Sequence, residues 1–167
     1  MARKPRIEFN FEPADVFIGI TTSIPMYRLV HFINQQTILN LVCENEIPVY
    51  FEKQDASFNF RFYHCSNENM FSDFSLVSNS NEGLALIPKL RQFNFFLVIQ
   101  GAIPASERTQ LVSQIKAIQG VQIAVALNQN PLPELGPVLQ DVELHLIELK
   151  KEKAGKLKKV MPSAENQ

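Results

Sequence analysis

The chain has 167 residues, of which 46% are hydrophobic and 20% charged. This length and this balance predict a globular protein that buries a core of its own. No stretch reaches the roughly 18 apolar residues of a membrane span, and no apolar segment follows the basic N-terminus as in a secretory signal. We therefore expect a soluble, cytoplasmic protein.

The net charge of −1 conceals a separation of charge along the chain. Residues 1–149 carry ten basic and fifteen acidic residues, whereas residues 150–159 hold six lysines and one acid. The lysines are Lys150, Lys151, Lys153, Lys156, Lys158 and Lys159. They are candidate contacts for nucleic acid, since lysine clusters attract phosphates.

The two cysteines and three histidines show no spacing typical of a metal site. Cys43 and Cys65 are far from a Cys-x-x-Cys pattern, and His31, His64 and His145 are equally scattered. In a reducing compartment, isolated cysteines are most often small buried side chains. We predict neither a metal ligand set nor a disulfide.

The first part of the chain predicts two short strands and a helix. Apolar residues alternate over 7–11, and a second strand is expected over 16–21. Pro25 suits a first helical turn, and an apolar stripe at helical spacing predicts a helix over 25–36. Its polar face includes a candidate surface contact formed by Tyr27, Arg28 and His31.

The middle of the chain predicts antiparallel strands. We expect a strand over 39–43, a loop at 44–46, and a hairpin with arms at 49–52 and 57–63. Three phenylalanines share one face of the second arm: Phe58, Phe60 and Phe62. Exposed aromatic residues beside Arg61 would also suit base stacking, but no RNA-binding motif surrounds them, so we assign them to the core.

A strand over 71–78 and a turn over 79–83 lead into the most apolar stretch, residues 84–101. Residues 87–92 form a connector containing Pro88, and residues 93–99 are almost entirely apolar and β-prone. Such a run is typical of a strand buried on both faces, which places it near the centre of a sheet.

The last third predicts a helix over 105–119 ended by Gly120, a strand over 121–127 and an amphipathic helix over about 133–152. Residues 153–167 are expected to be a disordered basic tail. The chain is thus predicted to be an α+β domain over 1–149, with a mostly antiparallel sheet and two or three helices packed on one face.

No known catalytic or cofactor motif occurs in the chain. The six glycines form neither a Gly-x-Gly-x-x-Gly nor a Walker pattern, and nucleophile elbows and zinc-protease signatures are absent. We assign no catalytic, cofactor-binding or metal-binding residue, and we do not favour an enzyme.

The segment Ile87-Pro88-Lys89-Leu90-Arg91-Gln92-Phe93-Asn94-Phe95 resembles a diverged signature of the IPExxxVDY family, small uncharacterised proteins found mainly in Bacteroidota. The similarity covers roughly residues 9–128. Lys89 and Asn94 replace the two acids of the signature, so a role that needs carboxylates there is not implied. The family implies no established activity.

Three functional hypotheses follow. The first is a non-enzymatic domain that acts through protein contacts, with the C-terminal amphipathic helix as the contact element. The second is weak association with nucleic acid or the ribosome through the lysine cluster. The third is binding of a small apolar ligand in a phenylalanine-lined pocket. Homo-oligomer formation stays open, as does the alternative that the helix packs on its own domain.

Overall fold

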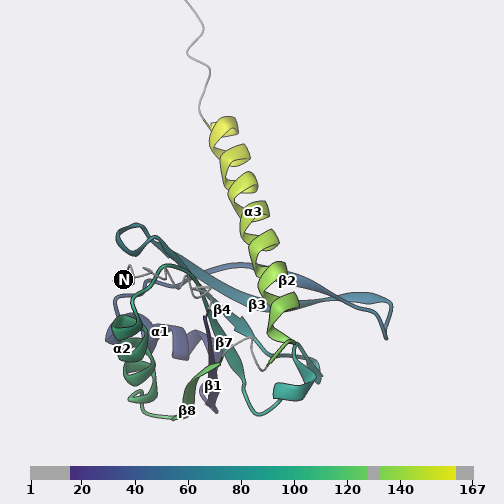
Figure 1. Cartoon of the computed structure of the whole chain (residues 1–167). Helices are drawn as coiled ribbons and strands as arrows, with labels where there is room; N and C mark the ends of the chain where they lie inside the picture. Colours follow the sequence, from purple (N-terminus) through teal and green to yellow (C-terminus); the bar gives the residue numbers. More distant parts are fainter. Residues whose placement is uncertain (1–15, 128–131, 161–167) are drawn as a thin grey trace, which may run out of the picture.

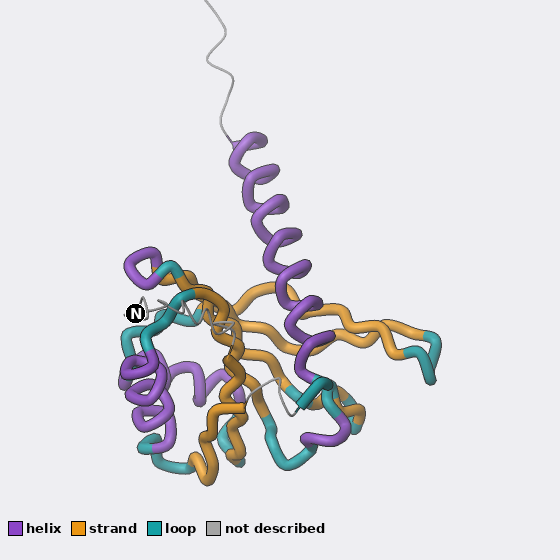
Figure 2. Tube along the Cα trace, viewed as in Figure 1, coloured by secondary structure: helices purple, strands orange, loops and turns teal. Residues whose placement is uncertain are grey.

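The computed structural model describes residues 16–127 and 132–160. Their main element is a six-stranded sheet in which every neighbouring pair is antiparallel. In spatial order, its strands are β2 (Val42–Phe51), β3 (Ala56–Asn67), β4 (Ser72–Ser78), β7 (Phe95–Gly101), β1 (Val16–Thr22) and β8 (Val121–Leu127). The predicted α+β class is confirmed, and the hairpin of β2 and β3 extends beyond the other strands (Figure 2).

Three helices cover the two faces of this sheet (Figure 1). The helices α1 (Met26–Gln36) and α2 (Ala105–Lys116) share one hydrophobic cluster with one sheet face. The third helix, α3 (Leu135–Val160), packs its first half on the opposite face in a second cluster. The prediction of helices on one face therefore holds for two of them, while the third closes the other side.

The strand β7 lies between β4 and β1 and is buried on both faces. Leu97 and Ile99 join the cluster under α1 and α2, whereas Phe96 and Val98 join the cluster under α3. All four side chains are completely buried. The prediction of a central apolar strand is confirmed, although the strand begins two residues later than expected.

The connector before β7 is organised by a buried asparagine, Asn79. Its amide nitrogen donates to the carbonyls of Leu90 (3.0 Å) and Phe93 (2.8 Å), and its Oδ1 accepts from the backbone N–H of Ile87 (2.9 Å). These bonds hold the 3₁₀ turn η2 (Pro88–Leu90). Between Asn79 and this turn, the chain forms a small hairpin of β5 (Ser80–Asn81) and β6 (Leu84–Ala85).

Two residues at the end of this connector take different roles. Phe93 is buried, and its ring occupies the space above Gly19, where a Cβ would lie 2.7 Å from the ring. Asn94 is exposed and accepts a hydrogen bond from the backbone N–H of Thr22 (2.8 Å) through Oδ1. Asn94 therefore closes the turn into β7 instead of lying in the core as the sequence suggested.

The strand predicted over 39–43 is confirmed only for Val42 and Cys43, and the loop predicted over 44–46 is wrong. Leu39 and Leu41 are buried, but β2 begins at Val42 and runs through the expected loop as a bulge between Glu44 and Ile47. The bulge lets the chain keep pairing with β3 although Asn45 and Glu46 together lie opposite one residue.

The basic segment also differs from the prediction. Residues 153–160, expected to be disordered, continue α3 to Val160, because lysine, leucine and alanine are good helix formers and a single exposed Gly155 is tolerated. The remainder of the predicted tail and the strand predicted over 7–11 lie outside the described residues.

Candidate functional site

A groove lies where α3 leaves the sheet over the beginning of β2 and the end of β3. A pocket of about 350 Å³ marks it. It is lined by Asn40, Val42, Glu44, His64, Cys65, Ser66, Leu146, Leu149, Lys150 and Lys153. The sequence predicted none of this convergence, because β2, β3 and α3 are far apart along the chain.

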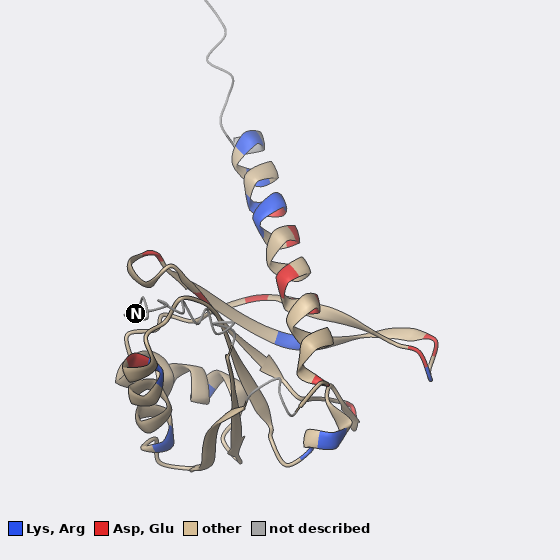
Figure 3. Cartoon of the chain, in the orientation of Figure 1, with Lys and Arg blue, Asp and Glu red and all other residues tan. Residues whose placement is uncertain are grey.

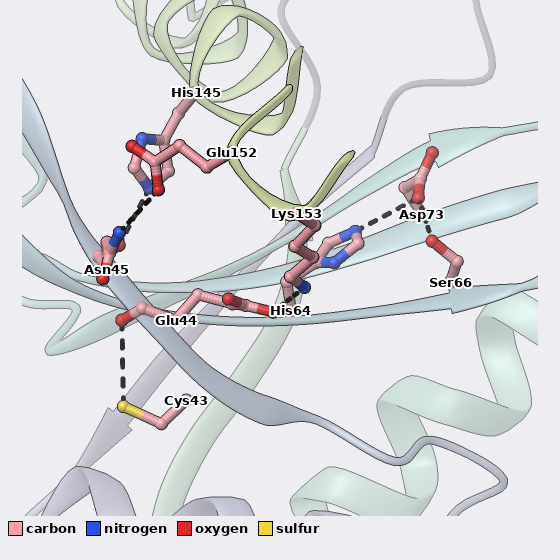
Figure 4. A network of polar contacts seen from close by, with 9 residues as sticks. All are labelled: Cys43, Glu44, Asn45, His64, Ser66, Asp73, His145, Glu152 and Lys153. Carbon is pink, nitrogen blue, oxygen red and sulfur yellow. Dashed lines mark hydrogen bonds and ion pairs between the residues drawn. The ribbon is translucent and has the colours of Figure 1, made fainter. Parts of the chain in front are cut away.

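The β2 bulge fixes α3 through a buried histidine (Figure 4). His145 Nε2 lies 2.8 Å from the carbonyl oxygen of Asn45. A carbonyl only accepts, so Nε2 donates and the imidazole carries its proton there. The same ring packs against the Phe62 ring in a T-shaped arrangement, with the two ring centroids 4.8 Å apart. The hydrogen bond from His145 to Asn45 therefore joins α3 to the β2 bulge, and the packing of the same ring on Phe62 adds an apolar contact.

Polar contacts continue along α3 towards its exposed end. Asn45 Nδ2 donates to Glu152 Oε2 at 3.1 Å, and Lys153 Nζ pairs with Glu44 Oε1 at 2.5 Å. A surface ion pair such as Lys153–Glu44 contributes about 0–1 kcal/mol. Lys153, predicted as a nucleic-acid contact, is therefore partly engaged in holding the helix to β2.

Three polar side chains of β3 and β4 meet at the floor of the groove (Figure 4). Asp73 Oδ1 accepts from Ser66 Oγ at 2.6 Å and lies 3.1 Å from His64 Nε2. Serine and histidine both bond to the carboxylate and not to each other. The arrangement therefore lacks the contact through which an imidazole activates a serine nucleophile.

Burial controls the titration of the groups near this floor. It lowers the pKa of His64 below the ordinary histidine value, while the hydrogen bond and charge of Asp73 act in the opposite direction. Burial likewise raises the pKa of the Cys65 thiol, which disfavours the reactive thiolate form. Among the described residues, no three histidine, cysteine, aspartate or glutamate side chains are placed to hold a metal ion.

The basic residues gather at the far end of α3 (Figure 3). Leu149 is the last residue of this helix that is buried against the sheet, and residues 150–158 are all exposed. This part of α3 contains five of the six candidate lysines: Lys150, Lys151, Lys153, Lys156 and Lys158. The side chain of Lys159 lies outside the described part of the molecule. We call residues 150–160 the projecting half of α3.

The second predicted surface lies elsewhere. Tyr27, Arg28 and His31 are exposed on the outer side of α1, on the face of the sheet opposite α3. The Arg28 guanidinium lies over the Phe32 ring, 5.9 Å from its centroid, and the His31 ring is 5.7 Å from the same ring. The structure does not bring these residues together with the lysines.

Sequence reasoning missed the anchoring residues of the groove. Asn45 lies in the segment predicted as a loop, and His145 lies between two residues of the apolar stripe predicted for the final helix. The position of His145 was the available signal, because a polar ring on a buried stripe needs a hydrogen-bond partner. Which partner it finds depends on the bulge.

Comparison with known proteins gave no relative: no family model, curated protein or solved structure matches the chain. The fold and groove define an antiparallel α+β protein with a projecting basic helix. The resemblance to the IPExxxVDY family stays a prediction. Within the described residues, no helix has both the length and the apolar character needed to cross a bilayer.

Proposed function

We propose that the protein is a non-enzymatic binding module that contacts a partner protein through the projecting half of α3. The observation that carries this proposal is the division of one 26-residue helix into two parts. The apolar stripe up to Leu149 is buried on the protein's own sheet, whereas residues 151–158 are exposed. The stripe therefore belongs to the core, and the contact element moves to the part beyond it.

The composition of the projecting half indicates the kind of partner. Leu157 is 63% exposed among the lysines, and Leu144 and Ile147 are more than half exposed on the outer side of the helix just before it. An isolated helix end of this length is marginal in water, and apolar contacts with a partner would stabilise it. The lysines favour an acidic surface.

Nucleic-acid binding through the same lysines is the second candidate. Successive residues of a helix are rotated by about 100°, so lysines at these spacings point to several sides of α3. A rod with charge on all sides suits phosphates without sequence preference, and its affinity would fall steeply with salt. The hypothesis of a small apolar ligand stays a prediction.

A matched pair of substitutions at Gly155 tests the leading proposal. The space around Gly155 is open, since a Cβ there would meet nothing within 4 Å. Gly155→Ala should therefore strengthen the projecting helix, and Gly155→Pro should break it while leaving every charge in place. The measurement is affinity purification of tagged full-length protein from its native cell, with and without nuclease, followed by mass spectrometry.

A protein partner that is recovered with wild type and Gly155→Ala, lost with Gly155→Pro and insensitive to nuclease would support the proposal. Recovery that depends on nuclease-sensitive material, and that Gly155→Pro leaves unchanged, would favour the nucleic-acid alternative. Equal recovery of nuclease-resistant partners by both variants would rule out the helical contact.

A further inference from the structure

A second surface lies at the end of the sheet where β3 turns into β4, on the face covered by α1 and α2. Phe71 in this turn is 86% exposed, more than any other large apolar side chain of the described residues. Its backbone is left-handed, with φ 48° and ψ 42°. This conformation is rare for a residue with a bulky side chain. Both the exposure of the Phe71 ring and its backbone conformation are therefore energetically unfavourable.

The turn is nevertheless built to hold this conformation. Asn67 Oδ1 accepts from the backbone N–H of Met70 at 3.2 Å, and Ser72 Oγ donates to the Met70 carbonyl at 2.9 Å. On the neighbouring strand, Gly101 leaves room for the turn, because a Cβ there would lie 2.3 Å from the Phe71 carbonyl oxygen. These contacts therefore fix the backbone of the turn while the Phe71 side chain stays exposed.

A pocket of about 410 Å³ adjoins the turn. Phe74, Leu39 and Leu111 provide buried apolar side chains at its base, and Met70, the residue before Phe71, lines it as well. Ile38, another lining residue, is 68% exposed. The two most exposed large apolar side chains of the described residues thus belong to one pocket and the turn beside it, as at protein interaction sites.

The charged residues that line this pocket or lie on the Phe71 turn are acidic. Glu107 is the only charged residue among the described residues that line it, and Glu68 lies on the same turn as Phe71. The other polar lining residues are the amides Asn67, Asn69, Gln110 and Gln114. A partner that places a cation beside the carboxylates is therefore complementary in charge.

We propose that this surface, which we call the Phe71 surface, docks a basic amphipathic segment of a partner protein. An apolar side chain of the segment enters the pocket above Phe74 and packs beside Phe71. Its lysine or arginine side chains lie by Glu68 and Glu107. The proposal does not rest on the projecting half of α3, which belongs to the opposite face of the sheet.

The probe is a synthetic amphipathic helix of leucine and lysine, compared with the same helix carrying glutamate in place of lysine. Binding to the full-length protein is followed by chemical shifts of its backbone amides. The test variant is Phe71→Asn, because asparagine adopts the left-handed conformation more readily than phenylalanine does. The variant should fold at least as well as wild type. Tyr27→Asn on α1, 65% exposed, is the matched control.

We expect saturable binding of the lysine helix, with shifts around Met70, Ile103 and Leu111. Phe71→Asn should weaken binding at least about tenfold, as loss of an interface anchor does, and Tyr27→Asn should not. Combined Glu68→Gln and Glu107→Gln should remove the preference for the lysine helix over the glutamate helix.

Three results would overturn the proposal. These are equal binding of the two helices by wild type, shifts that avoid the pocket, and affinity unchanged by Phe71→Asn. Self-association of the protein alone that Phe71→Asn abolishes would also overturn it, because the occupant would then be a second copy. None of these measurements depends on Gly155, so the proposed function of α3 is tested separately.

Discussion

At the scale of single residues, Asn79 is a buried polar side chain that holds the connector before β7 in place. It is 2% exposed and satisfies three backbone groups of the connector before β7. An asparagine after a strand looks like an ordinary turn residue in the sequence. Its importance comes from burial, since a buried backbone group without a partner costs about 1–3 kcal/mol.

We therefore predict that Asn79→Ala lowers the free energy of unfolding by about 3 kcal/mol or more, since three backbone groups lose their partner. Urea denaturation followed by circular dichroism measures this change. Asn81→Ala is the control, because Asn81 Nδ2 donates only to the Asn59 carbonyl at an exposed position. A loss for Asn79→Ala as small as that for Asn81→Ala would contradict the assignment.

His64 yields a prediction about pH. Burial lowers its pKa, whereas Asp73 and Glu44 raise it and Lys153 lowers it further. Because the folded pKa lies below the unfolded value of about 6.5, the unfolded chain binds more protons as the pH falls through that value. The contribution of His64 to stability is therefore present at neutral pH and is lost in acid.

The titration of the His64 ring, followed by NMR, should have a midpoint below the ordinary histidine value. Asp73→Asn should move the midpoint lower still, because it removes a neighbour that favours the imidazolium. A midpoint that rises in this variant would show that the charge of Asp73 does not stabilise the protonated ring.

At the scale of elements, the two halves of α3 differ in burial. Its first half buries six apolar side chains in the cluster beneath it: Leu135, Val138, Leu139, Val142, Leu146 and Leu149. Each contributes about 1.5–3 kcal/mol when fully buried. Their sum is comparable to the about 5–15 kcal/mol of a typical domain. The second half buries almost nothing.

Two truncations should therefore behave differently. Deleting residues 133–167 should yield an unfolded or aggregated product, because one face of the sheet loses its cover. Deleting residues 151–167 should cost only about 1 kcal/mol, since the contacts of Glu152 and Lys153 are surface contacts. Thermal unfolding of both products measures this, and a folded product of the longer deletion would refute the assignment of the stripe to the core.

At the scale of the whole molecule, the sheet separates two exposed surfaces that carry opposite charge. The basic projecting half of α3 belongs to one face, and the acidic Phe71 surface lies on the other. A molecule arranged in this way presents two surfaces of opposite charge that do not compete for the same partner. This separation arises only when the sheet forms.

The order of strands and helices could be predicted where local pattern and tertiary environment agree. The strand β8 (Val121–Leu127) has the predicted bounds, and α1 and α2 begin within one residue of them. Prediction failed where a tertiary contact changed the role of a residue. Glu44 and Asn45 have the composition of a loop, yet β3 and α3 supply the partners that keep them in a strand.

The α+β class, the apolar central strand, the buried stripes of the helices and the lysine cluster could be predicted from the sequence, because these features depend on side-chain period and composition. The packing of α3 on the second face and the exposure of Phe71 in a turn beside a pocket become visible only in the folded protein. The same is true of the hydrogen bond that joins His145 to the β2 bulge. These features depend on contacts between segments about 30 to 100 residues apart, and no local pattern encodes which distant segments meet.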